Sequence, residues 1–240
     1  MAGFKLNKRN YFSKKRPHLS VSQINDYIFN PEYYKARYIN LSITTKVTDA
    51  MKLGTLVDEL LTEGKTRLKR GKKSKKLTEH QLEKVVSETI WERGQAIAEF
   101  VSKHPFWQSL MGKKGVKKQL ILEGFLDGLL ICGKPDLVID PDILIDLKVS
   151  GATHVKNPNK WHYHCLDMGY YRQFAMYKTL LGQSFETPSY HLTVSETAPE
   201  FYELKLFKAD YEYVKIAFDE IKDAVSGIKE GKFNAKELTL

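Results

Sequence analysis

The chain has 240 residues, of which 42% are hydrophobic and 12% aromatic, and its formal net charge is +9. This length predicts one domain, this composition excludes an intrinsically disordered chain, and the absence of an apolar run of about 20 residues excludes a membrane-spanning helix. The basic N-terminus has no apolar stretch behind it, which predicts no secretory signal, and two cysteines, Cys132 and Cys165, exclude a disulfide scaffold and a thiolate metal cluster and predict a reducing, cytoplasmic location.

The positive charge favours a polyanionic partner, because Lys and Arg that neutralise phosphates release condensed counterions. Charge alone leaves open a soluble basic protein with no such partner. Eight basic residues and no acidic one lie between Lys65 and Lys76, in a loop that is either solvated or in contact with phosphates. We expect residues 1–17 to form a flexible basic arm and residues 18–240 a single domain with a basic loop at 64–77.

The first half of the chain predicts helices. Ser20 or Ser22 suits the N-cap of the first one, and Pro31 suits the first turn of a second, short one. Residues 49–63 form the next predicted helix, with apolar residues at helical spacing, and residues 78–103 form a long one. The apolar positions that define these two helices are Met51, Val57, Leu60 and Leu61 in the first, and Leu82, Val85, Val86, Ile90, Ile97 and Phe100 in the second.

The pattern then changes to short segments rich in β-branched residues. Segments 117–123, 128–140 and 143–149 predict a three-strand meander, with a hairpin signal at Asp127-Gly128 and a turn signal at Asp140-Pro141-Asp142. Pro135 has no N–H to donate, so the second strand is expected to be an edge or bulged there.

The remaining chain predicts a helix over 159–181 that ends at Gly182, strands over 189–195 and 201–207, and an amphipathic helix over 208–230. The core order is therefore helix, three strands, helix, strand. The expected fold class is α/β, with a mixed central sheet flanked by helices.

Asp146 and Lys148 carry the first chemical signal. Side chains alternate along a strand, so these two point the same way and Leu147 points into the core. One such pair is also typical of an ordinary exposed ion pair. Asp136 strengthens the signal, because an adjacent strand brings it beside Asp146, and two close carboxylates repel unless a cation lies between them. Mg²⁺ prefers oxygen ligands, so the pair predicts a metal site for phosphodiester hydrolysis; the alternative is that Asp136 merely caps a turn.

Several short motifs together carry a resemblance. Gly133-Lys134-Pro135-Asp136, Ile145-Asp146-Leu147-Lys148 and Gln173-x-x-x-Tyr177 resemble the RecB-type branch of the PD-(D/E)XK nucleases. Leu19-Ser20-Val21-Ser22 with Asn30-Pro31, Gly54-Thr55-Leu56-Val57-Asp58, and the segment from Gly169 to Tyr177 are similar to motifs of the phage and prophage exonucleases of the RecE (exonuclease VIII) type. The resemblance covers roughly residues 18–182.

The resemblance implies a PD-(D/E)XK fold and a metal-dependent exonuclease that digests duplex DNA ends, 5′ to 3′, for recombination. It implies that Asp136, Asp146 and the Leu147 carbonyl bind Mg²⁺ or Mn²⁺, that Lys148 assists the water, and that Gln173 and Tyr177 support the site. Glu123 matches an acidic residue of the first strand. We also expect DNA contacts from Lys72, Lys73, Lys75, Lys76 and Arg172. The expected partners are a single-strand annealing recombinase and further copies in a ring, in a bacterial host cell if the chain is phage-encoded.

Asp58 departs from the RecE-type pattern, which has a metal-ligating His at this place. Asp is also a competent Mg²⁺ ligand. Glu59 is the alternative ligand, about 100° away around the helix. Gly54, one turn earlier, is expected to let this helix approach the sheet closely.

Three further hypotheses stay open. The segment His162-x-His164-Cys165, with His154, hints at zinc, although no second ligand pair has finger spacing. The same fold also serves endonucleases, junction resolvases and DNA-binding modules without catalysis. Activity on closed circular DNA separates the endonuclease from the exonuclease.

Overall fold

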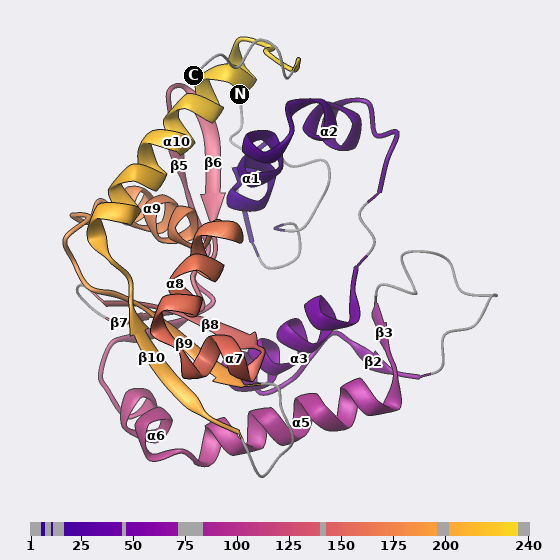
Figure 1. Cartoon of the computed structure of the whole chain (residues 1–240), viewed down its shortest axis with the longest axis vertical. Coiled ribbons are helices and arrows are strands. Elements are labelled where there is room, and N and C mark those ends of the chain that lie inside the picture. Colours follow the sequence, from indigo (N-terminus) through magenta and orange to yellow (C-terminus); the bar gives the residue numbers. More distant parts are fainter. Residues whose placement is uncertain are drawn as a thin grey trace.

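A five-stranded sheet lies between two layers of helices in this computed structural model (Figure 1). The structure describes residues 6–7, 11, 17–44, 47–71, 84–139, 143–195 and 202–234. The helices are α1 (Val21–Phe29), α2 (Pro31–Tyr34), the π-helical turn η1 (Lys35–Ile39), α3 (Asp49–Glu63), α5 (Glu88–Lys103), α6 (Pro105–Met111), α7 (Ala152–Lys156), α8 (Pro158–Asp167), α9 (Tyr170–Leu181) and α10 (Tyr211–Lys229). In this part of the chain, none of them is both long and apolar enough to cross a membrane.

The strands of the described segments form three sheets. They are β1 (Leu19–Ser20), β2 (Lys69–Arg70), β3 (Val85–Val86), β4 (Val116–Lys118), β5 (Leu122–Leu126), β6 (Leu129–Gly133), β7 (Leu137–Ile139), β8 (Ile143–Ser150), β9 (Ser189–Ser195) and β10 (Leu204–Lys208). The central sheet has the order β10-β9-β8-β7-β4, in which β8 and β9 are parallel and the other pairs antiparallel. A second sheet has the order β1-β6-β5, and β2 pairs with β3. This mixed sheet flanked by helices confirms the predicted α/β class.

Alternation along β8 divides the core into two clusters. Leu144 packs on one face of the sheet with residues such as Phe174 of α9 and Ile221 of α10. Ile145 packs on the other face with residues such as Ile97 of α5. Because successive strand residues face opposite ways, each face of β8 serves a different helical layer.

Local sequence explains most helix boundaries. Gln23 Oε1 accepts hydrogen bonds from the Ser20 backbone N–H at 2.9 Å and from its hydroxyl at 3.0 Å, so α1 begins after Ser20. Pro31 occupies the first turn of α2, and Gly182 ends α9 in a left-handed conformation with φ +65°. These features, the helix over 49–63 and the strand over 189–195 confirm the corresponding predictions.

Two predicted helices were wrong in extent. Val85 and Val86 pair with β2 as strand β3, and α5 begins only at Glu88, after the N-cap Ser87. The expected start at residue 78 lies outside the described residues. The helix expected over 159–181 is two helices, α8 and α9. Gly169, at φ +65°, separates them.

The predicted three-strand meander was also wrong, because two of its strands each divide between two sheets. The segment over 128–140 breaks at Lys134–Asp136 into β6 and β7, and Pro135 in this break has no N–H for a ladder. The segment over 117–123 divides into β4 and β5. The Asp127-Gly128 hairpin between β5 and β6 is confirmed, whereas the turn expected at 140–142 lies outside the described residues.

The N-terminal segment touches the domain at two described points. Leu6 and Tyr11 are buried and form a small cluster with Cys132 of β6. The structure describes residues 64–71 of the basic loop expected at 64–77, and residues 72–77 lie outside the described part.

Gly94 of α5, rather than Gly54 of α3, permits the close helix packing in this layer. A Cβ added at Gly94 would lie 2.4 Å from Leu56 Cδ2, whereas a Cβ at Gly54 would have no atom within 4 Å. The expectation that Gly54 lets its helix approach the sheet was therefore wrong. The close contact is between α3 and α5.

These two helical glycines give a matched test of the packing. We predict that Gly54→Ala raises the free energy of unfolding by about 0.5–1 kcal/mol, because Ala favours the helix. Gly94→Ala gains the same propensity but forces Leu56 to shift, and overpacking costs about 1–3 kcal/mol. Urea denaturation of both variants measures the difference. Equal stabilities would contradict the packing described for Gly94.

Candidate active site

The break between β6 and β7 places Asp136 beside β8. Leu137, the first residue of β7, pairs with Ile145, and the Leu147 N–H donates to Asp136 Oδ2 at 2.8 Å. Asp136 lies outside both strands, so its carboxylate is free to turn toward the backbone of β8. The strand order thus joins two residues that are ten positions apart in the sequence, Asp136 and Asp146.

Asp146 and Lys148 lie on the same face of β8. Asp146 is 3% exposed, and its carboxylate forms an ion pair with the Lys148 ammonium. Lys148 Nζ also donates to Gln173 Oε1 at 3.0 Å and lies 4.4 Å from the centre of the Tyr170 ring. Burial would lower the pKa of Lys148, but the carboxylate of Asp146 and other negative groups outweigh it, and the pKa is raised.

Helix α9 supports this face through two residues one turn apart, Gln173 and Tyr177. Tyr177 is buried, and its hydroxyl donates to the Lys134 carbonyl at 3.4 Å. A Cβ added at Gly133 would lie 2.7 Å from Tyr177 Cδ1, so only glycine leaves room for the ring there. The glycine of the Gly-Lys-Pro-Asp motif therefore lets α9 hold the segment that carries Asp136.

Gln119 joins Asp58 to Asp136. Its Nε2 donates to Asp58 Oδ1 at 2.8 Å, to Asp58 Oδ2 at 3.0 Å and to Asp136 Oδ1 at 3.1 Å. Sequence reasoning missed Gln119, because it stood inside a predicted strand and a lone Gln carries no motif. The break between β4 and β5 at this residue is what turns it toward the carboxylates.

The carboxylates repel one another. Burial, together with the negative charge of Asp146, raises the pKa of Asp58 to about 6, although Lys134 and Lys148 oppose the shift. Burial, Asp58 and Asp146 together raise the pKa of Asp136 well above its usual value. Removal from water and the nearby negative charge favour the neutral forms of Asp58 and Asp136.

Glu59, the alternative to Asp58, is engaged elsewhere. Its Oε2 accepts from the Thr66 hydroxyl at 2.7 Å and from the Arg67 N–H at 2.9 Å, and its Oε1 lies 2.9 Å from Arg67 Nε. Glu59 therefore holds the loop that follows α3, and Asp58 is the residue of this pair that meets Gln119.

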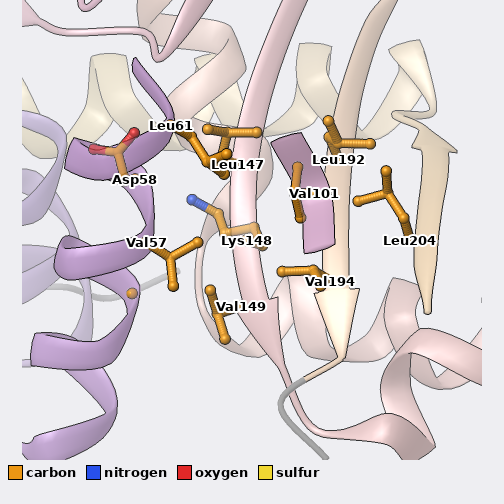
Figure 2. A pocket seen from close by; sticks show the side chains of 11 residues that line it. Val57, Asp58, Leu61, Val101, Leu147, Lys148, Val149, Leu192, Val194 and Leu204 are labelled. Atoms are coloured by element: carbon orange, nitrogen blue, oxygen red, sulfur yellow. The ribbon is translucent and has the colours of Figure 1, made fainter. Parts of the chain in front are cut away.

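One opening has Asp58 in its lining, and a second is lined by Glu59 and Lys134, which are close in sequence to Asp58 and Asp136. Figure 2 shows a small pocket between α3, which carries Asp58, and β8, which carries Leu147 and Lys148. A larger cavity of about 230 Å³ lies next to the loop after α3. Its lining is mostly charged and consists of Tyr11, Glu59, Glu63, Lys65, Thr66, Arg67 and Lys134.

The donor set suits a hard divalent cation by its chemistry. Asp58, Asp136 and Asp146 offer carboxylate oxygens, and the Leu147 carbonyl is the predicted backbone ligand. Among the described residues, no three acidic, His or Cys side chains converge as a finished metal site. Instead each carboxylate meets a donor of the protein: Gln119 Nε2, the Leu147 N–H or the Lys148 ammonium.

Other predicted residues do not meet this cluster. Glu123 lies on β5 in the second sheet and accepts from the Leu6 N–H at 3.1 Å, with His18 Nε2 3.5 Å away. Arg172 pairs with Glu220 of α10 at 2.6 Å and donates to Asn25. The DNA-contact prediction for Lys72, Lys73, Lys75 and Lys76 falls outside the described residues.

The histidine cluster supports no zinc site within the described residues. His154 and His164 stack with their ring centroids 4.4 Å apart, and His162 Nδ1 lies 2.7 Å from the Tyr171 hydroxyl. Cys165 is fully buried beside His191. These side chains therefore have separate partners and do not converge on a shared point.

The raised carboxyl pKa values predict how stability depends on pH. A folded-state pKa above the unfolded value means that the folded protein binds more protons, so metal-free stability falls as pH rises from about 4 through 6. Asp58→Asn removes one such group, and the fall should become shallower by up to about 1.4 kcal/mol per pH unit. Urea denaturation in EDTA across this range measures both slopes. Identical slopes would contradict the raised pKa of Asp58.

Solved structures of exonucleases resemble the chain to different degrees. No curated protein matches the chain in sequence. A candidate exonuclease from Eubacterium rectale has a TM-score of 0.71 at 18% identity, over 96% of this chain and 88% of that one. An alkaline exonuclease from Laribacter hongkongensis has a TM-score of 0.47 at 13% identity, over 93% of each chain. A phage-related exonuclease from Haemophilus somnus has a TM-score of 0.40 at 14% identity, over 89% of this chain and 96% of that one.

The Eubacterium rectale likeness is one of fold, given its low identity. The family model for the PDDEXK-like domain of unknown function (DUF3799) matches residues 20–237, nearly the whole chain. The chain therefore belongs to this PDDEXK-like family and has the PD-(D/E)XK fold.

Proposed function

We propose that this protein is a metal-dependent deoxyribonuclease that hydrolyses DNA phosphodiesters from duplex ends. The observation that carries the proposal is the junction of β7 and β8, where Asp136 accepts from the Leu147 N–H and Asp146 pairs with Lys148. Two carboxylates and an ammonium at one point suit phosphodiester hydrolysis, because the carboxylates bind a cation and the ammonium adds positive charge for the phosphate.

The cation proposed is Mg²⁺, with Mn²⁺ as a substitute, because all the proposed metal ligands are oxygen atoms. When bound, such a cation lowers the pKa of a water molecule and stabilises negative charge on a phosphate. Asp136 and Asp146 hold it, and Asp58 is the third carboxylate.

Lys148 acts as a fixed positive charge. Its raised pKa keeps the ammonium protonated at neutral pH, so it orients the attacking water and stabilises charge rather than accepting a proton. Gln173 and the Tyr170 ring hold the ammonium in place. Tyr177 fixes the backbone at Lys134, two residues before Asp136.

DNA binding is proposed for the basic side of the site. Lys65 and Lys134 line the cavity next to the loop after α3, and the basic run continues to Lys76. These residues would neutralise phosphates without reading sequence, because phosphate contacts carry no base information. Arg67 and Arg172 are left out, because Glu59 pairs with the first and Glu220 with the second.

The finer features of the proposal rest on the resemblance to RecE-type exonucleases. They are 5′ to 3′ polarity, the supply of single strands for recombination, a single-strand annealing partner and a ring of several copies. Linear duplex DNA and covalently closed circular DNA distinguish an exonuclease from an endonuclease, because only the exonuclease needs a DNA end.

We predict that the purified protein degrades linear duplex DNA with Mg²⁺, fails in EDTA and leaves covalently closed plasmid intact. Asp146→Asn and Lys148→Met should each reduce the rate roughly 100-fold or more, because loss of even outer partners of a metal site costs about 10–100-fold. Gel electrophoresis of end-labelled DNA measures the rate.

The exposed pair Asp219 and Lys222 on α10 provides matched controls. Asp219→Asn and Lys222→Met should digest DNA at the wild-type rate. Full activity of Asp146→Asn would remove this carboxylate from the mechanism. Rapid nicking of closed plasmid by the wild type would instead favour an endonuclease.

A second prediction separates the two neighbouring carboxylates of α3. Asp58→Ala should lower the cleavage rate roughly 100-fold, because it removes a proposed metal ligand. Glu59→Ala should leave cleavage within a few-fold while it loosens the loop that Arg67 and Thr66 anchor. Cleavage assays over a Mg²⁺ titration compare the two variants. An inactive Glu59→Ala beside an active Asp58→Ala would reverse the assignment.

A further inference from the structure

Gln119 is held in an unusual backbone conformation at the site. It follows β4 directly with φ +51°, a left-handed conformation that residues with a side chain rarely adopt. Its N–H donates to the Asp136 carbonyl at 2.8 Å. The backbone of Gln119 is therefore fastened to the residue whose side chain it also contacts. Such strain persists only where the surroundings impose it, and it clusters at functional sites.

The two ends of the Gln119 amide have opposite surroundings. Nε2 faces three carboxylate oxygens, two from Asp58 and one from Asp136. Oε1 is buried and finds no donor among the residues that the structure describes, and the residue as a whole is 3% exposed. A buried acceptor without a donor is costly, so this arrangement leaves the amide oxygen available for another partner.

Nε2 lies against the carboxylates of Asp58 and Asp136. A cation at this place would relieve the repulsion between these two carboxylates. An amide nitrogen has two hydrogens for these three oxygens, and it carries only a partial positive charge. A divalent cation between Asp58 and Asp136 would displace it. A half-turn of the amide group exchanges the two ends, because the oxygen and nitrogen of Gln have nearly the same shape.

We propose that Gln119 is a metal ligand that exchanges its amide ends: Nε2 holds Asp58 and Asp136 together without metal, and Oε1 binds the divalent cation. This proposal rests on the proposed function, because it concerns the same metal. The neutral amide oxygen adds a hard ligand to the carboxylates without adding to their repulsion.

The Gln119→Met variant separates this proposal from a simpler one. Met has nearly the same length but neither an amide donor nor an amide oxygen. If Oε1 binds the metal, Gln119→Met weakens Mn²⁺ binding by roughly 10-fold or more. If the amide is only a donor that metal must displace, its removal leaves Mn²⁺ binding unchanged or makes it tighter. The two accounts therefore predict opposite changes.

Isothermal titration calorimetry with Mn²⁺ at pH 8, without DNA, measures the dissociation constant. Gln108→Met, on the exposed face of α6, is the matched control and should bind Mn²⁺ as the wild type does. Thermal unfolding in EDTA establishes that Gln119→Met is folded. Unchanged or tighter binding by the folded variant overturns the proposal.

A crystal structure of the wild-type protein with Mn²⁺ gives the same answer without a variant. The proposal requires a Gln119 side-chain oxygen within about 2.0–2.4 Å of the ion that anomalous scattering locates. An ion at Asp136 and Asp146 with Gln119 Nε2 still on Asp58 would overturn it. If the protein still hydrolyses DNA, that outcome contradicts only the role of Gln119 as a ligand. If the protein does not hydrolyse DNA, the proposed nuclease function itself is wrong.

Discussion

Repulsion among three carboxylates is the constraint around which this molecule is arranged. Asp58 comes from α3, Asp136 from the break before β7, and Asp146 from β8, and burial next to one another raises the pKa values of Asp58 and Asp136. Folding places them together at a cost, so donors must offset it. Three groups donate to these carboxylates and offset the repulsion: the Leu147 N–H, the Lys148 ammonium and the Gln119 amide.

The broken strands make that arrangement possible. Had the segment over 128–140 continued as one strand, Asp136 would have stayed in its ladder; the break after Gly133 instead sends β6 into one sheet and β7 into another. The break between β4 and β5 does the same for Gln119. The site thus lies where the sheets separate, and α3 and α9 close it from two sides, with Asp58 on one helix and Gln173 and Tyr177 on the other.

Much of the fold could be predicted from local signals. Capping at Ser20, the apolar spacing over 49–63 and the alternation that puts Asp146 and Lys148 on one face all act within a few residues. The breaks between β6 and β7 and between β4 and β5 could not be predicted in full. Whether such a segment forms one strand or two depends on which sheet each of its halves pairs with. Gln119 was missed for a similar reason. Its role comes from Asp58, 61 positions away, and a glutamine inside a predicted strand carries no pattern.

The number of protons released when metal binds tests most directly the claim that buried carboxylates repel one another at this site. Metal binds ionised carboxylates, so a site whose Asp58 has a pKa of about 6 must release protons when it fills near that pH. Titration calorimetry of Mn²⁺ at pH 6 and pH 8, in buffers with different ionisation enthalpies, counts them. The account predicts metal binding at both values, with more protons released at pH 6 than at pH 8. Absence of metal binding, or equal release at both values, would contradict it.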